Sequence, residues 1–555
     1  MEIDMDKPWL KSYDEQVPHT IQYPDQILYQ SFQEAVQKNP DGIATLFVGA
    51  KIRYRELGRL VDRFASALAG LGVEKKDRVA LILPNIPAYP IAHFAVMKLG
   101  GVLVPTNPLY VERELEYQLN DSGAETVVIL DQLYPRLEQV RKRTAVERVI
   151  LVRIQDFLPR ILGLLYGLKN KSPVDSLQSG DVHEYRHLIR KSFPLAPAAE
   201  VSPDDTAILL YTGGTTGVSK GAVLTHRNLS VNVRQTRSWL WSIEERKEIF
   251  LCVLPFFHSY GMTTGLHLST LTQSTMLLAP RFELADVVKQ IKKHRPTIFC
   301  AVPSMYNAIN RYSGISSSDV ASIRLCISGG AALPAAVQEK FESLTGGKLV
   351  EGYGLSETSP VALVNPTHGH RKSGTIGVPI PGTEARVVDP ESGETLPSQE
   401  IGELAIRGPQ VMSGYWEMPQ ETEQVLRQGW LYTGDMAVMD EEGFFTIVDR
   451  KKDLIISAGM NIYPREVEEV LHQHPKVVEA AVLGIPSAVR EEIAKAFIVV
   501  EEGEELTRQE IIQFCRDKLA RYKVPKQIDF VDELPKSALD KVLKRVLKEQ
   551  ASESS

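Results

Sequence analysis

The chain has little cysteine, no long apolar run and no excess of basic charge. Only four of its 555 residues are cysteines, too few for a disulfide framework and too widely spaced for a CxxC-type metal site. A reducing, cytosolic setting is therefore expected. Its apolar stretches fall short of the roughly 18 residues that a membrane-spanning helix needs. The first residues are acidic where a signal peptide would be basic, which argues against secretion.

The charge balance is slightly acidic. The chain has 63 lysines and arginines against 70 aspartates and glutamates, a formal net charge of -7. That balance gives no whole-chain electrostatic reason to bind nucleic acid. Its length, at about 100–200 residues per domain, indicates several structural units. Composition therefore favours a multi-domain soluble protein, most simply an enzyme.

The apolar pattern predicts an α/β fold in the first part of the chain. Apolar residues at helical spacing across 57–71 predict a helix with one buried face, and the apolar runs at 78–83 and 102–105 predict buried strands. The strand pattern returns at 297–303 and 325–328. Helices that alternate with buried strands predict parallel sheets with helical crossovers.

The pattern changes twice towards the C-terminus. After residue 374, short apolar runs separated by turn dipeptides such as Pro381-Gly382 predict a β-rich region, a small barrel. From residue 453 a mixed α+β pattern predicts a separate domain of about 100 residues.

One segment, residues 156–171, is apolar and basic and has no acidic residue after Asp156. It is either an insertion packed on the domain surface or a contact with a membrane surface or an acyl chain. Pro159 and two glycines argue against a regular amphipathic helix. The sequence leaves both alternatives open.

The strongest chemical motif is a loop of glycines and hydroxyls that follows an apolar strand at 207–211. Glycines let backbone N–H groups wrap phosphate oxygens, and Lys220 adds a positive charge. The spacing is not that of a Walker A loop. The motif predicts phosphate binding by Thr212, Gly213, Gly214, Thr215, Thr216, Gly217 and Lys220.

A second motif contains Tyr353, Gly354, Glu357 and Thr358. It is not a dinucleotide-binding fingerprint, because Glu357 stands where the third glycine should be. A carboxylate beside a hydroxyl suits Mg²⁺, which takes one or two carboxylates together with phosphate oxygens. Taken alone, the motif is better explained as a surface turn.

Four later residues are also ambiguous when taken alone. Asp435 follows an expected tight turn and could accept hydrogen bonds from ribose hydroxyls, or be a plain turn residue. Arg450 and Lys452 belong to a charged run that could be a solvated linker. Lys541 stands in a loop near the C-terminus, where an isolated lysine is usually solvated.

Together and in this order, these motifs resemble the adenylate-forming superfamily of acyl-CoA synthetases, luciferases and peptide-synthetase adenylation domains. The resemblance runs from about residue 31 to 548. The runs YTGGTTG, EGYGLSETSPV, GWLYTGD and DRKKDLIISAGMNIYPREVEEVL are most similar to bacterial long-chain fatty-acid–CoA ligases. The implied fold has two helix-flanked sheets and a distorted β-barrel in residues 1–449, a hinge at 450–452, and a small mobile α+β domain at 453–555.

The resemblance implies a reaction in two halves with ATP, Mg²⁺ and coenzyme A. A carboxylate attacks the α-phosphate of ATP to give acyl-adenylate and pyrophosphate, and a thiol then displaces AMP. Lys452 would be the hinge about which the C-terminal domain turns, presenting Lys541 in one orientation and the face near Gly459 in the other. The remaining implied roles are β- and γ-phosphate binding by Thr215, Thr216 and Lys220, Mg²⁺ binding by Glu357 with Thr215, adenine stacking by Tyr353, ribose binding by Asp435 and Arg450, and catalysis at the α-phosphate by Lys541.

Residues 254–262 resemble the family's substrate-side motif, which implies that His258 lines the acyl pocket. Amino-acid-activating relatives use an aspartate there, whereas residues 249–282 contain no acidic residue. A substrate ammonium would be left unpaired, so amino acids are disfavoured. A long-chain fatty acid is predicted, in the cytoplasm, with peripheral contact at the inner membrane surface left open. Asp540 departs from the family pattern, which usually has glycine there.

The alternatives are a ligase for medium-chain or aromatic acids, an enzyme that loads a carrier protein, and a non-catalytic fatty-acid-binding or uptake protein. Because all the implied reactive residues are present, lost chemistry is disfavoured.

Overall fold

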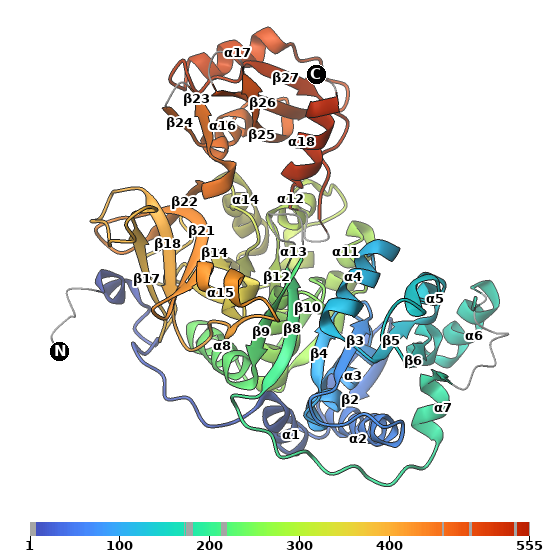
Figure 1. Ribbon diagram of the computed structural model, residues 1–555. Coiled ribbons are helices and arrows are strands. Elements are labelled where there is room, and N and C mark those ends of the chain that lie inside the picture. Colours follow the sequence, from blue (N-terminus) through green and yellow to red (C-terminus); the bar gives the residue numbers. More distant parts are fainter. Residues whose placement is uncertain are drawn as a thin grey trace. The chain divides into compact units, whose positions relative to one another are not determined.

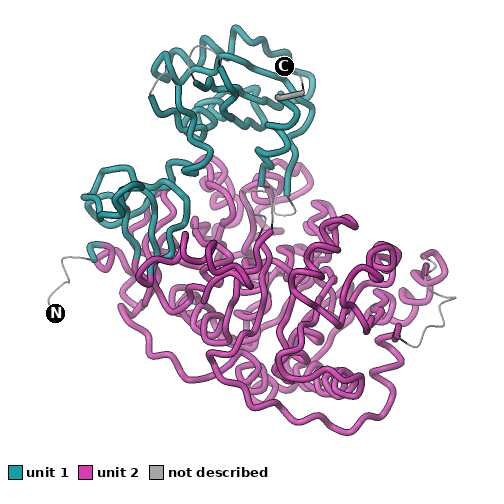
Figure 2. Tube along the Cα trace, viewed as in Figure 1, with its two compact units in different colours: residues 1–8, 385–406, 430–555 teal, residues 9–384, 407–429 magenta. Residues whose placement is uncertain are grey.

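The computed structural model describes residues 7–170, 172–173, 181–212, 219–457, 460–487, 491–537 and 541–553 (Figure 1). The chain divides into two compact units (Figure 2). Unit 1 comprises Met1–Pro8, Ala385–Ile406 and Trp430–Ser555, and unit 2 comprises Trp9–Glu384 and Arg407–Gly429. Residues 407–429 therefore interrupt unit 1 and complete unit 2.

Unit 2 contains a nine-stranded sheet that is parallel from β14 through β1 and antiparallel at both edges. In order across the sheet the strands are β16 (Val378–Pro379), β15 (Val361–Val364), β14 (Lys348–Gly354), β13 (Leu325–Ser328), β12 (Ile298–Ala301), β10 (Ile249–Cys252), β11 (Thr275–Leu278), β1 (Ile43–Phe47) and β2 (Ala50–Arg53).

A second, eight-stranded sheet also belongs to unit 2. It is parallel from β8 through β7, and β9 and β19 extend it antiparallel at one edge. In order the strands are β19 (Gly414–Tyr415), β9 (Lys220–Thr225), β8 (Thr206–Thr212), β4 (Val102–Pro105), β3 (Arg78–Ile82), β5 (Thr126–Leu130), β6 (Arg148–Val152) and β7 (Val182–Glu184).

The predicted crossover helices are present. In α2 (Tyr54–Gly70), Leu57, Val61 and Phe64 are fully buried, which confirms the helical spacing of the apolar residues. It contacts α3 (Ala88–Lys98), in which every residue is buried, as expected for a helix without a polar face. The expected strands at 78–83, 102–105, 297–303 and 325–328 are β3, β4, β12 and β13, with ends that differ by two residues at most.

Unit 1 contains two smaller sheets. The first is the β-rich region expected after residue 374, built from β17 (Glu384–Val388), β18 (Gly402–Arg407), β21 (Trp430–Met439) and β22 (Phe445–Arg450). The second is the α+β region, with sheet order β24 (Met460–Ile462), β23 (Ile455–Ser457), β26 (Glu491–Val500), β25 (Val477–Ser487), and with β27 (Gln527–Phe530) parallel to β26. Its helices are α16 (Pro464–His472), α17 (Arg508–Arg516) and α18 (Lys544–Glu553).

The ambiguous apolar segment forms a helix, α6 (Arg160–Lys169), at the periphery of unit 2 (Figure 1). Pro159 does not prevent this helix, because it precedes the first turn, where its fixed φ is tolerated. None of the residues of α6 is buried. The helix is thus present without a packed apolar face.

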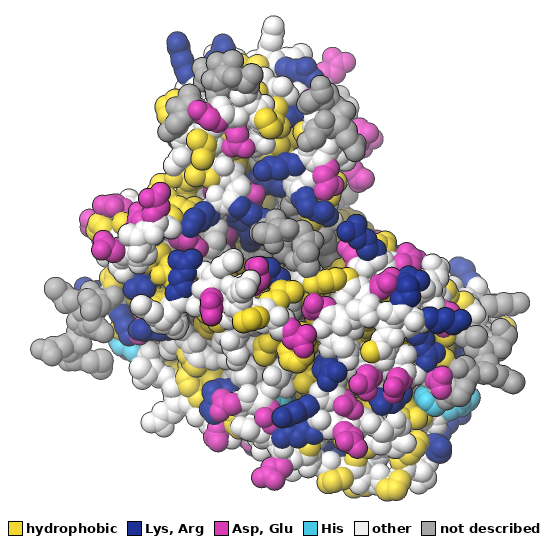
Figure 3. All heavy atoms as spheres, in the orientation of Figure 1, with side chains coloured by type: hydrophobic (Ala, Val, Ile, Leu, Met, Phe, Trp, Pro, Cys, Tyr) yellow, Lys and Arg dark blue, Asp and Glu magenta, His cyan; other side chains and the backbone are white. Residues whose placement is uncertain are grey.

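Three further observations bear on the sequence-based expectations. The four cysteines, Cys252, Cys300, Cys326 and Cys515, are free and buried. Within the described residues, no helix combines the length and apolarity that crossing a bilayer requires. Acidic and basic side chains are interspersed over the face drawn in Figure 3.

Candidate functional site

The motif that is predicted to bind phosphate lies at the end of a β-hairpin in unit 2. Strands β8 and β9 pair so that Thr212 stands opposite Lys220. The Ser219 hydroxyl donates to the Thr212 carbonyl at 2.6 Å, which joins the two ends of the loop. The predicted phosphate ligands Gly213, Gly214, Thr215, Thr216 and Gly217 lie outside the described residues. The described part of the motif thus consists of Thr212 and Ser219, which flank the loop, and of Lys220.

Lys220 has two charged or aromatic neighbours from a distant part of the chain. Its ammonium forms an ion pair with Glu421 of α15 (Pro419–Val425). It also lies 5.2 Å from the centroid of the Tyr415 ring, close enough for a cation–π interaction. Tyr415 is held there because β19 pairs with β9, with Tyr415 opposite Ala222.

Tyr415 joins Lys220 to Glu357. Its hydroxyl donates to Glu357 Oε1 at 2.8 Å. Burial raises the pKa of Tyr415, and the nearby carboxylates of Glu357 and Glu421 raise it further, so the phenol stays protonated and remains a donor. The structure therefore brings together Lys220 and Glu357, which lie in separate sequence motifs.

Glu357 is the carboxylate for which the sequence predicts a role in binding Mg²⁺. It stands on a short 3₁₀ helix (Ser356–Thr358) and is only partly buried. Within the described ranges, no group of three or more His, Cys, Asp or Glu side chains forms a ready-made metal site. A single carboxylate fits an ion that completes its coordination with phosphate oxygens and water.

The other residues of this motif shape the loop that carries Glu357. A Cβ atom at Gly354 would lie 1.7 Å from the Pro360 carbonyl oxygen, so only glycine fits. Thr358 is fully buried. Its hydroxyl accepts from the Leu355 N–H at 3.0 Å and donates to the Pro360 carbonyl at 2.5 Å. These contacts support a positioning role for Thr358, while Tyr353 stays partly exposed in β14.

His258 stands beside the same loop. Its Nδ1 accepts from the Tyr260 N–H at 3.2 Å, which caps the short helix Ser259–Gly261. The hydroxyl of Ser259 lies 3.4 Å from that of Ser356. The substrate-side motif and the Glu357 loop are therefore neighbours, and His258 is partly exposed.

In unit 1, Asp435 of β21 and Arg450 of β22 are directly opposed across two antiparallel strands. Arg450 Nε lies 3.2 Å from Asp435 Oδ1. The tight turn expected before Asp435 is not a chain reversal. Gly434 adopts φ +72° within β21, and its N–H donates to Glu403 Oε1 at 3.0 Å. Glycine readily adopts a left-handed conformation inside a strand, and this conformation redirects the residue that follows.

Lys541 precedes α18 in unit 1. Its N–H donates to the Ser537 hydroxyl at 3.2 Å, and its carbonyl accepts from the Ser537 N–H at 2.8 Å. Lys541 as a whole residue is exposed, but the surrounding protein desolvates its ammonium. This desolvation lowers the pKa of Lys541 to about 8. The positive charge of Arg450 acts in the same direction.

Lys541 thus belongs to the same electrostatic cluster as the Asp435–Arg450 pair. The Asp435 carboxylate opposes the lowering of its pKa, and the ammonium of Lys452 reinforces it. Lys452 itself follows β22 in a single 3₁₀ turn (Lys451–Asp453), and desolvation lowers its pKa too. Asp540 and Gly459, to which the sequence drew attention, lie outside the described residues.

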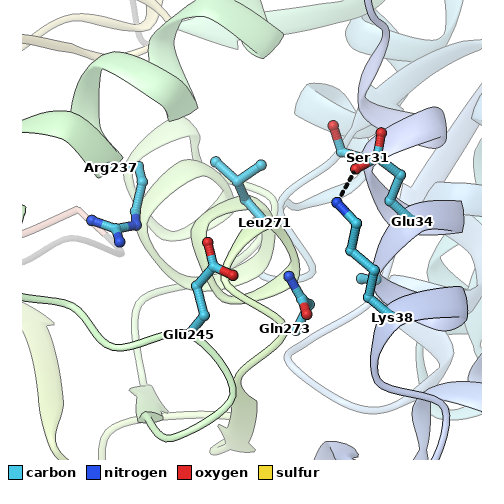
Figure 4. Close-up of a pocket in the computed structure, with 8 residues that line it drawn as sticks. Ser31, Glu34, Lys38, Arg237, Glu245, Leu271 and Gln273 are labelled. Atoms are coloured by element: carbon cyan, nitrogen blue, oxygen red, sulfur yellow. Dashed lines mark hydrogen bonds and ion pairs between the residues drawn. The ribbon is translucent and has the colours of Figure 1, made fainter.

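A polar cavity of about 220 Å³ lies elsewhere in unit 2 (Figure 4). Its two cations are already engaged, since Lys38 pairs with Glu34 at 2.7 Å and Arg237 donates to the Ile243 carbonyl at 3.0 Å. It contains none of the residues that the motifs single out. The cavity is therefore not the candidate reaction site.

Sequence reasoning missed Tyr415 and Glu421. The run Gly414-Tyr415-Trp416, an aromatic pair after a glycine between two recognised motifs, was the available signal. The separation of 201 residues between Lys220 and Glu421 hid the ion pair.

The comparisons with known proteins agree with this arrangement. The model of the family described as "AMP-binding enzyme" matches residues 32–416, and that of the "AMP-binding enzyme C-terminal domain" matches residues 466–541. Asp435, Arg450 and Lys452 fall between the two matches, and Lys541 is the last residue of the second.

Full-length relatives are also found. The long-chain-fatty-acid–CoA ligase of Bacillus subtilis (strain 168) is 42% identical over 552 residues, with 99% of each chain covered. The protein of the same name from Escherichia coli O157:H7 is 41% identical over 557 residues, again with 99% of each covered. The crystal structure of ATP-bound MatB from Rhodopseudomonas palustris superposes with a TM-score of 0.84 at 29% identity, covering 95% of this chain and 99% of that one. The motifs, the fold and both family matches agree, and the chain belongs to the AMP-binding enzyme family.

Proposed function

We propose that this protein is a long-chain fatty-acid–CoA ligase. It activates a fatty acid with ATP to give an acyl-adenylate and pyrophosphate, then transfers the acyl group to coenzyme A and releases AMP. The observation that carries the proposal is the 42% identity over 99% of both chains to a protein of that name. The grouping of Lys220 with Glu357, and of Asp435 and Arg450 with Lys541, supports it.

In the first half-reaction the residues of unit 2 handle the phosphates. Lys220 neutralises charge on the β- and γ-phosphates, together with the backbone and hydroxyls of the glycine-rich loop, including Thr215 and Thr216. Tyr353 stacks beside adenine. Glu357, with Thr215, would hold Mg²⁺, which would supply positive charge beside the leaving pyrophosphate. Electrostatic stabilisation of this kind usually contributes most to catalysis of phosphoryl and nucleotidyl transfer.

The residues of unit 1 handle the ribose and the reacting centre. The Asp435 carboxylate, held by Arg450 at 3.2 Å, accepts the ribose hydroxyls. Lys541 donates to the α-phosphate and to the substrate carboxylate as they approach. A lysine whose pKa is lowered to about 8 still carries its charge at neutral pH and loses it in mildly alkaline solution.

The acyl group is proposed to lie beside His258, in a region without acidic side chains between residues 249 and 282. An apolar chain carries no charge to neutralise there, which supports a fatty acid over an amino acid. Medium-chain or aromatic acids, and a carrier protein as thiol, are the alternatives that an assay separates.

The decisive experiment is pyrophosphate release over a panel of acids, with and without coenzyme A. Release with long-chain fatty acids, with stoichiometric loss of free coenzyme A thiol, is expected. Release that consumes no coenzyme A would favour carrier loading instead. No release with any acid would contradict the proposal and favour a binding or uptake protein.

We also propose that residues 450–452 are the hinge between residues 1–449 and a mobile domain of residues 453–555. The two compact units group residues 430–449 with the C-terminal region, so the hinge concerns motion and does not follow a unit boundary. Lys541→Ala is expected to abolish acyl-adenylate formation while leaving the thiol reaction of preformed acyl-adenylate intact. Equal loss of both half-reactions would contradict the two-orientation scheme.

The protein is further proposed to be cytoplasmic and to touch the membrane surface through α6. The orientation of this helix supports the idea. A Cβ atom at Gly163 would lie 2.8 Å from the Gln155 carbonyl oxygen, and one at Gly167 would lie 2.7 Å from Gln155 Oε1. The two glycines, four residues apart, thus form the face that packs closely on the preceding turn.

The leucine-rich face of α6 consequently points to solvent. Ile161, Leu164 and Leu168 are 75%, 72% and 78% exposed. The helix has Arg160 and Lys169 at its ends and no acidic residue between them. An exposed apolar face with flanking cations fits an anionic bilayer surface.

Vesicle flotation tests this contact. Leu164→Ser combined with Leu168→Ser should lower binding to phosphatidylglycerol-containing vesicles by about tenfold or more, since burying each leucine contributes about 1.5–3 kcal/mol. The matched control is Leu109→Ser with Leu195→Ser, because these leucines are similarly exposed, at 70% and 73%, but lie outside α6. Equal flotation of both double variants would discard the idea.

A further inference from the structure

We propose that Glu421 is a positioning residue that holds the Lys220 ammonium whenever no phosphate group occupies the neighbouring subsite, and that it thereby promotes the departure of pyrophosphate. The inference rests on the proposed phosphate-binding role of Lys220. It assigns a function to a carboxylate that none of the recognised motifs contains.

The two members of the ion pair differ in their exposure to solvent. The Lys220 side chain is 17% exposed, whereas that of Glu421 is 39% exposed. A mostly buried ammonium is costly without a partner, but a carboxylate near the surface can be hydrated when its partner leaves. Loss of the ion pair therefore costs the Lys220 ammonium more free energy than it costs the Glu421 carboxylate.

Tyr415 does not replace Glu421 as a partner. Its hydroxyl is engaged with Glu357 at 2.8 Å, and only its ring faces the Lys220 ammonium, at 5.2 Å. Among the described residues, Glu421 is thus the anion in direct contact with Lys220. A phosphate oxygen that binds Lys220 must compete with this carboxylate.

The position of Glu421 is fixed by local structure. The hydroxyl of Thr422 accepts from the Tyr415 N–H at 2.9 Å and donates to the Met418 carbonyl at 2.8 Å. At Gly414 a Cβ atom would lie 2.8 Å from Thr422 Cγ2, so the glycine lets α15 approach β19 closely. The helix that carries Glu421 is therefore fastened to the strand that pairs with β9.

The consequence is an exchange of partners without any covalent step. When the triphosphate enters, the Lys220 ammonium leaves Glu421 for phosphate oxygens, and the carboxylate becomes hydrated. When adenylate formation is complete, the carboxylate attracts Lys220 back and repels the pyrophosphate. Removal of the negative charge should strengthen the binding of pyrophosphate and slow its release.

The test measures pyrophosphate as a product inhibitor of the full-length enzyme, together with the KM for ATP. Glu421→Gln should lower the inhibition constant of pyrophosphate by about five- to tenfold and lower the KM for ATP. Added salt should shrink the difference, because screening weakens the lost charge interaction. Glu421→Asp, which keeps the charge, should restore values near those of the wild type.

The matched control is Glu423→Gln, which removes the same charge two residues away from an exposed position on α15. It should stay within about twofold of the wild type, since exposed charges contribute little. Weaker pyrophosphate binding in Glu421→Gln, or equal values in the two glutamine variants, would overturn the inference.

Two further measurements complete the design. Thermal melting identifies loss of folding in Glu421→Gln. In that case the folded Glu421→Asp variant decides: a pyrophosphate inhibition constant about fivefold or more below that of the wild type, although the charge is kept, would overturn the inference. Lys220→Ala separates the role of the lysine from that of the glutamate. If it leaves pyrophosphate binding unchanged, the proposed role of Lys220 fails; if it abolishes binding while Glu421→Gln has no effect, only the role of Glu421 fails.

Discussion

Among single side chains, Lys541 has the clearest dependence on pH. Desolvation and the charge of Arg450 lower its pKa from 10.5 to about 8, so its ammonium form is lost as the pH rises through that value. The pH dependence of kcat/KM for ATP in the adenylation reaction reports the pKa values of groups in the free enzyme. This kcat/KM is expected to fall as the pH rises through about 8 and to be flat below about pH 7, where the ammonium form predominates.

Lys541→Arg tests this assignment. A guanidinium stays protonated throughout the alkaline range, so the variant should be slower but should lack the alkaline fall. The measurement is the pH profile of pyrophosphate release in the presence of a fatty acid. An alkaline fall that persists unchanged in the arginine variant would show that another group titrates.

Three buried histidines predict sensitivity to acid. The Nε2 atoms of His93 and His267 lie 3.0 Å apart, and His226 is also fully buried. Burial lowers the pKa of His267 to about 3 and of His226 to about 4, and lowers that of His93 well below its usual value of 6.5. Their neutral forms stabilise the fold above pH 6.5, and this stability is lost as the pH falls below it.

The expected loss is about 1 kcal/mol per histidine between pH about 6.5 and about 5.5. Denaturant midpoints measured at several pH values should show a shallower slope in His267→Gln than in the wild type. The exposed His19→Gln should keep the slope of the wild type. Identical slopes in all three proteins would mean that these buried rings do not govern the acid response.

Local motifs predict only some of the proposed site residues. Lys220 and Glu357 stand in short runs whose composition has a physical reason, whereas the roles of Asp435, Arg450 and Lys541 are predicted through the family resemblance. Glu421 has no such run, and the importance of both Tyr415 and Glu421 arises from pairing across about 200 residues. Sequence spacing alone does not reveal which distant carboxylate faces a lysine.

At the level of loops, Gly354 controls the position of Glu357. A Cβ atom there would overlap the Pro360 carbonyl, so Gly354→Ala must displace the loop. The expected result is a loss of stability of about 1–3 kcal/mol and a raised KM for ATP. Denaturant unfolding and ATP titration measure the two effects.

Gly346→Ala is the control for Gly354→Ala. Gly346 has φ +70° and open space around its Cβ position, so alanine there adds backbone strain without displacing a neighbour. It should cost stability without changing the KM for ATP. If Gly354→Ala also leaves that KM unchanged, the loop does not position the glutamate for nucleotide binding.

The helices and strands followed the apolar pattern closely, and α6 shows where that approach reaches its limit. Apolar residues usually mark the packed face of a helix, but in α6 the glycines form the face that packs on the preceding turn. Close packing on Gln155 is a contact outside the helix, and periodicity does not register it. The same glycines that argued against a helix are what hold it in place.

For the molecule as a whole, Arg465 provides a test of the proposed rotation. Its N–H donates to Asp449 Oδ2 at 2.8 Å, and its guanidinium donates to the Ile447 carbonyl at 2.7 Å. These bonds join α16 to β22 across the proposed hinge, in the arrangement in which Lys541 lies near Asp435 and Arg450. Breaking them should disfavour that arrangement.

Arg465→Ala is therefore expected to slow adenylation several-fold while sparing the reaction of preformed acyl-adenylate with coenzyme A. Single-turnover measurements of the two half-reactions give the answer. Arg508→Ala, at an exposed position on α17 away from the hinge, should affect neither. Equal slowing of both half-reactions by Arg465→Ala would indicate a general structural defect.

The division into two units could not be predicted from the sequence. Changes in apolar pattern suggested boundaries near residues 374 and 453, because pattern reports which kind of element forms locally. Assignment of residues 407–429 to unit 2 depends instead on β19 pairing with β9, a contact between strands almost 200 residues apart.

The pairing of β19 with β9 has a consequence for folding during synthesis on the ribosome. Strand β9 is complete once residue 225 has been synthesised, but its partner β19 emerges only after about 190 further residues have been added. In the interval the outer edge of β9 is an open template for any other nascent strand. Cellular production of this protein should therefore depend on chaperones most strongly during translation of the middle of the chain, well before the catalytic lysine has been made.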